Sequence, residues 1–438
     1  MARHSLLFSA FDAEGHGRSA MAASAMTAMI LTANDGKLRR RLPAFRALLS
    51  CIALALAGCS TALGPIGGGP VETAPTGPSA AGPAASGLPT EPGLGAARVA
   101  LILLLSAGGN AGAAAQSMKN ATELALAEFS NPNVQLIVKD DGGTPQGAQT
   151  AARAALQEGA EIVLGPLFSG SVAAAGQVTK SRGIPMIAFS TDTNVAAKGV
   201  YLLSFLPESD VDRIVRYAAA NGRKSLVALL PDNAYGAVIE AQLQQAVSQI
   251  GGRIVSIERY ANEPAKLVEP VRRAAAASKQ ADAVFIADSS DTTPQIVQAL
   301  AKNGVSQQRI QFIGTGLWDD PKLFADPNLA GAWFAAPDSA GYRAFVERYR
   351  SRFGQEPART ASLAYDAVSL LAALVKTQGP NRFSEATLTN PSGFSGIDGV
   401  FRFRADGTCE RGLAVMEMRG GGTRVISPAP RAFSNAAL

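Results

Sequence analysis

Several hydroxyl groups of this sequence directly follow short apolar runs, where they could take part in binding chemistry. In the first half of the chain this polar group consists of Ser169, Gly170, Ser190 and Thr191. Ser169 follows the apolar run 161–164 and Ser190 follows the run 185–188. Hydroxyls beside the free N–H groups at the start of a helix suit a carboxylate or another anion. The alternative for Ser169 is a structural role as the N-cap of the helix that follows.

A second polar group follows apolar runs further along the chain. It consists of Tyr235, Asp288, Trp318 and Asp319. Tyr235 and Trp318 offer aromatic surfaces, and a carboxylate such as Asp288 or Asp319 can pair with a cation. The adjacent pairs Asp140-Asp141 and Asp319-Asp320 also invite a metal-binding interpretation. Neighbouring residues on one segment usually point apart, so we expect turn and cap roles there and no metal site.

The composition excludes several classes of catalytic site. His4 and His16 are the two histidines of the sequence, and both precede a segment that we expect to be removed. Without histidine there is no Ser-His-Asp or Cys-His nucleophile system and no histidine metal site. The glycines in 106–112 do not keep the G-x-G-x-x-G order, and neither a P-loop nor a G-x-S-x-G elbow occurs. We therefore predict a non-enzymatic protein with no catalytic residue, cofactor or metal; an enzyme such as an amidase is the least favoured alternative.

The N-terminal region resembles a lipoprotein export signal. A basic stretch at 37–41 precedes an apolar run at 47–58, which is shorter than the roughly 20 residues that span a bilayer. Leu56-Ala57-Gly58-Cys59 resembles the bacterial lipobox, in which the cysteine is lipidated and becomes the new N-terminus. We interpret 1–58 as an N-terminal extension with a signal peptide and Cys59 as the lipidation site. Ser60 after the cysteine is typical of outer-membrane sorting, so we expect a periplasmic protein anchored to that membrane.

Removal of 1–58 changes the charge of the chain. It removes seven Lys/Arg and three Asp/Glu, which leaves 33 basic and 32 acidic residues. A nearly neutral chain gives no electrostatic case for nucleic-acid binding. Residues 60–96 contain seven Pro and nine Gly, so we expect 59–96 to be the lipidated cysteine followed by a tether. Cys409 then has no internal disulfide partner.

From residue 97 onward, strands and helices are expected to alternate. Continuous apolar runs predict buried strands, and apolar residues at helical spacing predict helices. The predicted strands are 99–105, 134–138, 161–164, 185–188, 225–230, 253–257, 283–287, 310–313, 399–404 and 413–418. The predicted helices are 116–129, 145–157, 170–182, 208–221, 235–250, 267–278, 294–303, 339–353 and 360–377. This alternation is typical of α/β proteins with parallel sheets flanked by helices, here in two series.

Three segments resemble the type I periplasmic binding proteins of the leucine/isoleucine/valine-binding family. They are Ile162-Val-Leu-Gly-Pro-Leu-Phe-Ser169, Gly183-Ile-Pro-Met-Ile-Ala188 and Asp232-Asn-Ala-Tyr-Gly236. The resemblance implies an α/β, two-lobed type I periplasmic binding protein fold with three crossings between the lobes and a ligand cleft at the hinge. It places lobe 1 at 97–206 and 316–390, lobe 2 at 207–315 and 391–427, and a tail at 428–438.

The same resemblance implies how a ligand is held. Ser169 and the segment of Ser190 and Thr191 would bind the ligand carboxylate, and Tyr235 would line the opposite lobe. The carboxylate that pairs with a ligand ammonium in the family falls at Gly316 in this chain. Asp319 and Asp288 are the candidate replacements. Without a replacement, we expect leucine, isoleucine and valine to bind weakly, because an unpaired buried charge costs several kcal/mol.

Three further segments resemble a narrower group, the lipoprotein activators of penicillin-binding proteins. They are Gly314–Pro321, Ala332–Pro337 and Gly396–Arg404. The sequence therefore favours an activator of peptidoglycan synthesis whose partner is a penicillin-binding protein. The alternative is the solute-binding component of an ABC importer for branched-chain amino acids or short peptides, whose partner is a permease. In both, the membrane is reached only through the lipid anchor, and a small molecule with a carboxylate could occupy the cleft.

The lipid anchor can be tested by fractionation. We expect a Cys59→Ser variant to lose its lipid and to appear with soluble periplasmic proteins, because a serine offers no thiol for lipid attachment. Immunoblots of the membrane and soluble fractions, with an antibody against the folded region, measure how the protein is distributed between them. A Cys409→Ser variant, which keeps the lipobox, should remain with the membrane. Retention of Cys59→Ser in the membrane fraction would show that the lipobox prediction is wrong.

Overall fold

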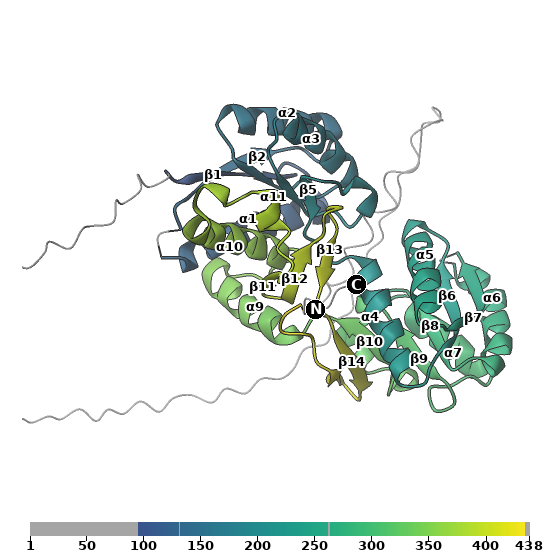
Figure 1. Cartoon of the computed structure of the whole chain (residues 1–438). Coiled ribbons are helices and arrows are strands. Elements are labelled where there is room, and N and C mark those ends of the chain that lie inside the picture. Colours follow the sequence, from purple (N-terminus) through teal and green to yellow (C-terminus); the bar gives the residue numbers. More distant parts are fainter. Residues whose placement is uncertain (1–94, 131, 262, 434–438) are drawn as a thin grey trace, which may run out of the picture. The chain divides into compact units, whose positions relative to one another are not determined.

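The computed structural model describes residues 95–130, 132–261 and 263–433. The predicted signal peptide, the lipidation site at Cys59 and almost all of the tether lie outside the described residues, so those interpretations stay predictions. Within the described part, two strand-and-helix assemblies, called lobe 1 and lobe 2 below, are built around separate sheets (Figure 1).

Lobe 1 is built on a parallel five-stranded sheet of order β2-β1-β3-β4-β5. Its strands are β1 (Ala97–Leu103), β2 (Val134–Asp140), β3 (Ile162–Leu164), β4 (Met186–Ala188) and β5 (Val200–Leu202). The connecting helices are α1 (Gly109–Glu128), α2 (Pro145–Gln157) and α3 (Ser169–Ser181), with a 3-10 turn η1 (Thr193–Val195). Two helices from later in the chain, α9 (Ser339–Phe353) and α10 (Ala361–Thr377), complete the lobe.

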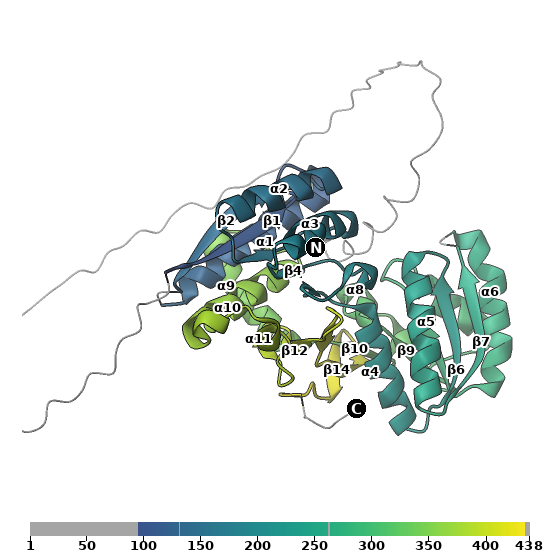
Figure 2. The same ribbon diagram turned by 45° about the horizontal axis from the view of Figure 1, so that its top comes forward.

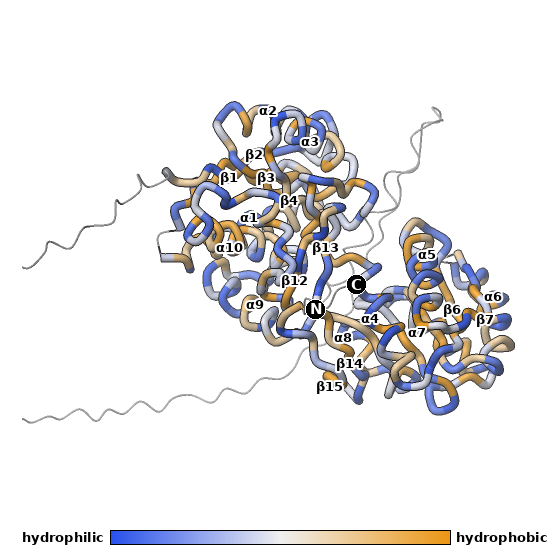
Figure 3. The backbone as a smooth tube through the Cα atoms, in the orientation of Figure 1, coloured by the Kyte–Doolittle hydropathy of each residue, from blue (hydrophilic) through white to orange (hydrophobic). Residues whose placement is uncertain are grey.

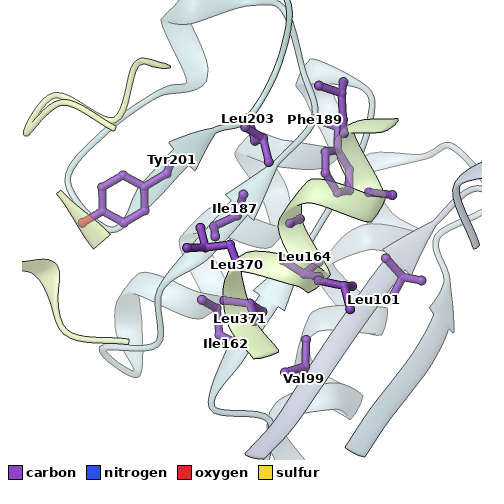
Figure 4. Packing of buried hydrophobic residues seen from close by; sticks show 14 of the residues in the cluster. Val99, Leu101, Ile162, Leu164, Ile187, Phe189, Tyr201, Leu203, Leu370 and Leu371 are labelled. Atoms are coloured by element: carbon purple, nitrogen blue, oxygen red, sulfur yellow. The ribbon is translucent and has the colours of Figure 1, made fainter. Parts of the chain in front are cut away.

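Both faces of the lobe 1 sheet are apolar because side chains alternate between them along each strand. One face carries Val99, Leu101, Ile162, Leu164 and Ile187, and packs against α1 and α10. Figure 4 shows Leu370 and Leu371 of α10 beside these strand residues. The opposite face carries Ala100, Ile102, Val163 and Met186, and packs against α2 and α3. The strands are apolar along their whole length because helices cover both faces of the sheet.

Lobe 2 is built on a seven-stranded sheet of order β15-β14-β10-β9-β8-β6-β7. Its strands are β6 (Ser225–Pro231), β7 (Arg253–Tyr260), β8 (Ala283–Ile286), β9 (Gln311–Gly314), β10 (Trp333–Ala336), β14 (Ala414–Arg419) and β15 (Gly422–Ser427). β6 to β10 are parallel, and β14 joins them antiparallel to β10. The helices are α4 (Pro207–Ala220), α5 (Ala234–Gln249), α6 (Pro264–Ala277), α7 (Thr293–Lys302) and the short α8 (Pro321–Phe324).

The lobe 2 sheet is covered in the same way as the sheet of lobe 1. α4 and α5 cover one face over Leu226, Ala228 and Phe285, and α6 and α7 cover the other over Val227 and Val284. Orange apolar segments lie along the strands and blue polar segments along the outer loops in Figure 3. Together with the sheet order, this arrangement confirms the predicted α/β fold of parallel sheets flanked by helices.

The strands near the C-terminus differ from the prediction. The last two predicted strands, 399–404 and 413–418, belong to different sheets. β12 (Gly399–Phe403) pairs with β11 (Phe394–Gly396) and β13 (Cys409–Arg411) in a three-stranded antiparallel sheet. β14 joins lobe 2 instead. The turn at 404–408 therefore connects β12 to β13, a strand of three residues that the apolar pattern did not predict.

The lobe boundaries also differ from the predicted ones. The segment 316–336, assigned to lobe 1, ends in β10, which is a strand of the lobe 2 sheet. The segment 391–411, assigned to lobe 2, contributes Phe401, Phe403 and Cys409 to the apolar core of lobe 1. The chain therefore crosses between the lobes after β5, after β10 and after β13, which agrees with the three crossings expected from the resemblance.

Arg359 and Arg411 contact the segments of the first and third crossings. Arg359 forms a bidentate ion pair with the fully buried Asp398, with Nη2···Oδ1 at 2.7 Å and Nη1···Oδ2 at 3.0 Å. Arg411, at the third crossing, donates from Nε to the Ser204 carbonyl at the first crossing, at 3.0 Å. The ring of Phe205 has the Arg359 guanidinium 4.3 Å and the Arg411 guanidinium 4.8 Å from its centroid. The first and third crossings are thus joined by direct contacts. Figure 2 gives a second view of α4, β10 and β12, the elements beside which the crossings lie.

Cys409 is a structural thiol. Its side chain is buried in the lobe 1 core, and burial raises the pKa of the thiol to about 11. It stays protonated at neutral pH, which makes it a poor nucleophile.

No helix in the described ranges is long and apolar enough to cross a membrane.

The packing of α10 predicts a large stability effect in lobe 1. Leu371 is completely buried, so Leu371→Ala should lower the free energy of unfolding by about 2–5 kcal/mol through lost burial and a residual cavity. Urea denaturation followed by circular dichroism measures this. Val268→Ala, at a position that is 59% exposed, is the matched control and should change the stability by no more than about 0.5 kcal/mol. Equal effects of the two changes would contradict the assignment of α10 to the core.

Candidate functional site

In lobe 1, the predicted anion-binding residues lie where β3 and β4 end. Ser169 is the first residue of α3, and Phe168 occupies the N-cap position. A phenylalanine side chain cannot accept hydrogen bonds, so the N-cap residue of α3 gives no side-chain hydrogen bond to the first N–H groups of the helix. The N-cap role considered for Ser169 is therefore wrong. Ser169 and Gly170 instead stand in the first helical turn, beside N–H groups that suit an anion.

A glycine requirement fixes the turn before α3. Gly165 has φ of +85°, and a Cβ atom there would lie 2.0 Å from the Ile102 carbonyl oxygen. Only glycine fits such a close approach. The next residue, Pro166, accepts a hydrogen bond at its carbonyl from the Phe189 N–H, at 3.0 Å. This bond ties the loop before α3 to the loop that carries Ser190 and Thr191.

Ser190 is buried, and its Oγ accepts a hydrogen bond from the Asp192 N–H at 3.1 Å. The hydroxyl hydrogen remains able to donate to another group. Thr191, the next residue, is partly exposed. The structure thus brings the loops of Ser169, Gly170, Ser190 and Thr191 to neighbouring strand ends of one lobe, as the order of the parallel strands predicts.

In lobe 2, Tyr235 lies in the first turn of α5, just after β6. Asn233 caps this helix by accepting from the Gly236 N–H at 2.9 Å, which places Tyr235 at the carboxyl end of the sheet. The Tyr235 hydroxyl lies 2.9 Å from the hydroxyl of Thr315, which follows β9. The ring is largely buried, and burial raises the pKa of the phenol, so Tyr235 is a neutral hydrogen-bonding group.

Asp288 follows β8 at the same end of the sheet. Its Oδ2 accepts a hydrogen bond from the hydroxyl of Tyr260, the last residue of β7, at 2.7 Å. Its Oδ1 accepts from the Ser289 N–H at 2.6 Å. Burial raises the pKa of the Asp288 carboxyl despite these two donors. Both oxygens of this carboxylate are thus occupied by protein donors.

The structure adds a carboxylate that the sequence analysis did not identify. Asp210, in the first turn of α4, accepts a hydrogen bond at Oδ2 from the Gly316 N–H at 2.9 Å. A Cβ atom at Gly316 would lie 3.0 Å from the same oxygen. A carboxylate therefore does stand beside position 316, but it comes from another segment. An acidic residue in the first turn of a helix is common for electrostatic reasons, so the residue type of Asp210 alone did not indicate a binding role.

Three carboxylates gather around Tyr235 without a cation. Asp210, Asp288 and Glu208 all raise the pKa of the Tyr235 phenol through their negative charge. In the part of the chain that the structure describes, none of the three forms an ion pair with a lysine or arginine. Burial raises the pKa of Glu208, and it raises that of Asp210 to about 7. This end of lobe 2 is therefore a desolvated, electronegative site.

A hydrogen bond links this site to the lobe 1 loop. Thr193 Oγ1 donates to Glu208 Oε1 at 3.1 Å. Thr193 begins the 3-10 turn directly after Ser190, Thr191 and Asp192, and Glu208 begins α4 with Pro207. The loop that carries Ser190 and Thr191 and the electronegative site are thus connected at the first crossing.

Trp318 and Asp319 do not join this group. Trp318 is completely buried in the lobe 2 core, and its ring lies against Gly314, where a Cβ atom would be 2.3 Å from Cδ2. The interpretation of Trp318 as a ligand-binding surface is therefore wrong. Asp319 interacts electrostatically with Arg359 and Tyr342, which belong to lobe 1. Both follow the same apolar run as Thr315, but the intervening 3-10 turn η3 (Gly316–Trp318) directs the chain away.

No group of three or more His, Cys, Asp or Glu side chains in the described residues has the arrangement of a metal site. Asp320 caps α8 through the Lys322 N–H, and the Asp140 carboxylate accepts from the Gly142 N–H, as the expected turn and cap roles require.

Comparison with known families gives a clear assignment. The sequence profile described as "Periplasmic binding protein" matches residues 97–423, which is most of the chain. The protein therefore belongs to the periplasmic binding protein family. An uncharacterised protein of Rickettsia prowazekii (strain Madrid E) is 26% identical over 157 residues, which cover 36% of this chain and 41% of that protein.

Solved structures of this class share the fold. A protein of Rhodospirillum rubrum, described as belonging to a branched-chain amino acid ABC transporter, has a TM-score of 0.66 and 20% identity, over 76% of this chain and 100% of its own. A substrate-binding protein of Streptococcus pneumoniae in complex with isoleucine has a TM-score of 0.52 and 19% identity, over 76% and 99%. A solute-binding protein of R. palustris in complex with benzoate has a TM-score of 0.54 and 20% identity, over 78% and 99%. They confirm the type I two-lobed architecture.

The raised pKa of Asp210 predicts a pH-dependent stability. Between its ordinary value of 3.8 and about 7, the folded protein keeps a proton on this carboxyl that the unfolded chain has lost. The stabilising contribution is thus complete below pH 3.8 and is lost as the pH rises to about 7. Asp210→Asn should therefore stabilise the protein by about 1–3 kcal/mol more at about pH 8 than at about pH 4.

Urea denaturation at the two pH values measures this difference. Asp212→Asn is the matched control, since Asp212 lies on the same helix and pairs with Arg216 at the surface. Its effect on stability should be small at both pH values. A gain for Asp210→Asn that is the same at both pH values would show that Asp210 is not desolvated.

Proposed function

We propose that this protein is the solute-binding component of an ABC importer and that its ligand is a small molecule with a carboxylate. The observation that carries this proposal is the pairing of two unlike sites at the strand ends of the two lobes. Lobe 1 offers the uncapped start of α3 with the hydroxyls of Ser169, Ser190 and Thr191. Lobe 2 offers Tyr235 beside carboxylates that form no ion pair with a lysine or arginine of the described residues.

The chemistry of the lobe 1 site supports a carboxylate ligand. Free N–H groups at the start of a helix and hydroxyl donors stabilise negative charge. A carboxylate of a bound solute would lie against the first turn of α3 and the Ser190–Thr191 loop, and Tyr235 would line the other side of the ligand cleft. The isoleucine and benzoate complexes of proteins with this fold are consistent with a carboxylate as the shared ligand group.

A binding role also agrees with the absence of catalytic machinery in our interpretation. Tyr235 is a neutral phenol held by Thr315, and Cys409 is a protonated thiol buried in the lobe 1 core. Neither offers a nucleophile beside a base. The family assignment favours a periplasmic location, and the lipobox at Cys59 would anchor the protein to a membrane.

The second candidate is an activator of penicillin-binding proteins. The observation in its favour is the resemblance of Gly314–Pro321, Ala332–Pro337 and Gly396–Arg404 to that group. In the structure these segments form the end of β9 with η3, strand β10, and the β11–β12 hairpin. These segments lie at or beside the crossings between the lobes. The resemblance therefore concerns the architecture of the fold more than a surface that binds a partner protein.

Calorimetry distinguishes the two candidates. We expect at least one of leucine, isoleucine, valine and benzoate to bind with micromolar affinity, about −8 kcal/mol. Thr191→Val should weaken that binding about ten- to hundredfold, because it removes a hydrogen bond to a charged group. Thr150→Val, at an exposed position on α2, is the control and should leave binding unchanged. Capture of a penicillin-binding protein with no binding of any solute would favour the activator.

A further inference from the structure

The segment that follows β15 makes a further connection between the lobes, besides the crossings. It leaves the lobe 2 sheet at Ser427 and continues through residues 428–433. Near its start, Ala429 packs against the lobe 2 core that contains β8 and α7. Phe433 contacts the β11–β12 hairpin, whose Phe401 belongs to the lobe 1 core. This segment therefore passes from one lobe to the other within a few residues.

The start of the segment is fixed to lobe 2 by Arg213 of α4. Its guanidinium donates from Nη2 to Ser427 Oγ at 2.6 Å and from Nε to the Leu413 carbonyl at 2.8 Å. Leu413 directly follows Gly412 at the third crossing. One side chain therefore holds both the third crossing and the base of the segment 428–433 where they meet lobe 2.

Pro430 covers the glycine of the third crossing. A Cβ atom at Gly412 would lie 2.8 Å from Pro430 Cγ and 2.7 Å from Val400 Cγ2. The Gly412 N–H donates to the Val400 carbonyl at 2.9 Å. Hinges consist of a few residues, often small ones, that absorb a change of φ and ψ when lobes move. A rotation of the backbone at Gly412 would have to displace Pro430.

Phe433 fixes the other end of the segment to lobe 1. Its ring centroid lies 4.5 Å from Arg402 Cζ, which is a cation–π contact. A Cβ atom at Gly393 would lie 2.7 Å from Phe433 Cδ2, so the ring packs directly against the glycine backbone. Arg402 is itself held by Glu410, with Nη2···Oε2 at 2.8 Å. The segment is thus attached at both ends, to lobe 2 through Arg213 and to lobe 1 through Arg402.

We infer that residues 428–433 act as a strap, a further link between the lobes that restricts hinge motion at the third crossing. Without the strap, Gly412 could take up the change of φ and ψ that a movement of the lobes requires. With the strap in place, such a movement has to separate Pro430 from Gly412 or Phe433 from Arg402. This restriction is independent of the solute that the protein binds.

Hydrogen exchange measured by NMR tests the strap, because the Gly412 N–H reports on the third crossing. In Phe433→Ala, exchange of this amide should become about two- to fivefold faster, the factor expected for the loss of one exposed cation–π contact. Phe433→Tyr keeps the aromatic ring and should exchange at the wild-type rate. Arg431→Ala, at an exposed position of the same segment, is the matched control and should also leave the rate unchanged.

Small-angle X-ray scattering measures the motion of the lobes directly. A variant that ends at Ser427 lacks the strap and should show a broader distribution of distances between the lobes than the wild-type protein. Exchange in β1 and β6, which lie in the interiors of the two sheets, should stay unchanged in this variant and in Phe433→Ala. Unchanged exchange there shows that both lobes remain folded.

Three outcomes would overturn the inference. The first is a wild-type exchange rate of the Gly412 N–H in Phe433→Ala, and the second is identical scattering with and without the strap. The third is faster exchange in β1 as well as at Gly412, because Phe433 would then stabilise lobe 1 as a whole instead of restraining the hinge.

Discussion

The apolar face that the lobe 1 sheet turns toward α1 needs a second helix, and that helix comes from the far end of the folded region. The first 110 or so residues of this region provide α1, α2 and α3, and two of these cover the opposite face or its edge. α10 completes the core with Leu363, Leu371 and Leu374. The chain must therefore leave lobe 1, build the sheet of lobe 2 and return. The crossings follow from this burial requirement.

The crossings in turn determine where the polar residues lie. α4 begins directly after the first crossing, so Glu208 and Asp210 stand in its first turn, beside the end of β9. The N–H groups at the start of a helix favour negative charge, but burial makes the pKa of both carboxyls higher than usual.

Much of the fold followed from the sequence because both lobes have buried parallel strands. Uninterrupted apolar runs such as 225–230 and 283–287 marked strands to within a residue or two, and helical spacing marked α2 and α9 at their observed bounds. β5, β10, β11, β13 and β15 were not predicted, and all of them except β15 have only three or four residues. Because β10 was missing from the prediction, the predicted boundary between the lobes was shifted.

The candidate site was predictable in lobe 1 and only in part in lobe 2. Ser169, Ser190 and Tyr235 follow buried strands in the sequence, so strand order alone brings them to sheet ends. Trp318 follows a strand equally closely, but the 3-10 turn η3 returns its ring to the core. Asp210 lies in the lobe 2 site, but the strand that precedes it in the sequence, β5, belongs to lobe 1. Its position depends on the packing of α4 beside β9 and β10, a contact between segments about a hundred residues apart that local pattern does not encode.

The most direct test of the account is a native mass spectrum of the protein purified from its periplasmic compartment without denaturation. The account predicts a folded protein that retains one small molecule, and that molecule, released by acid, should contain a carboxyl group. A protein that carries no small molecule, and gains none when it is incubated with amino acids, would contradict it.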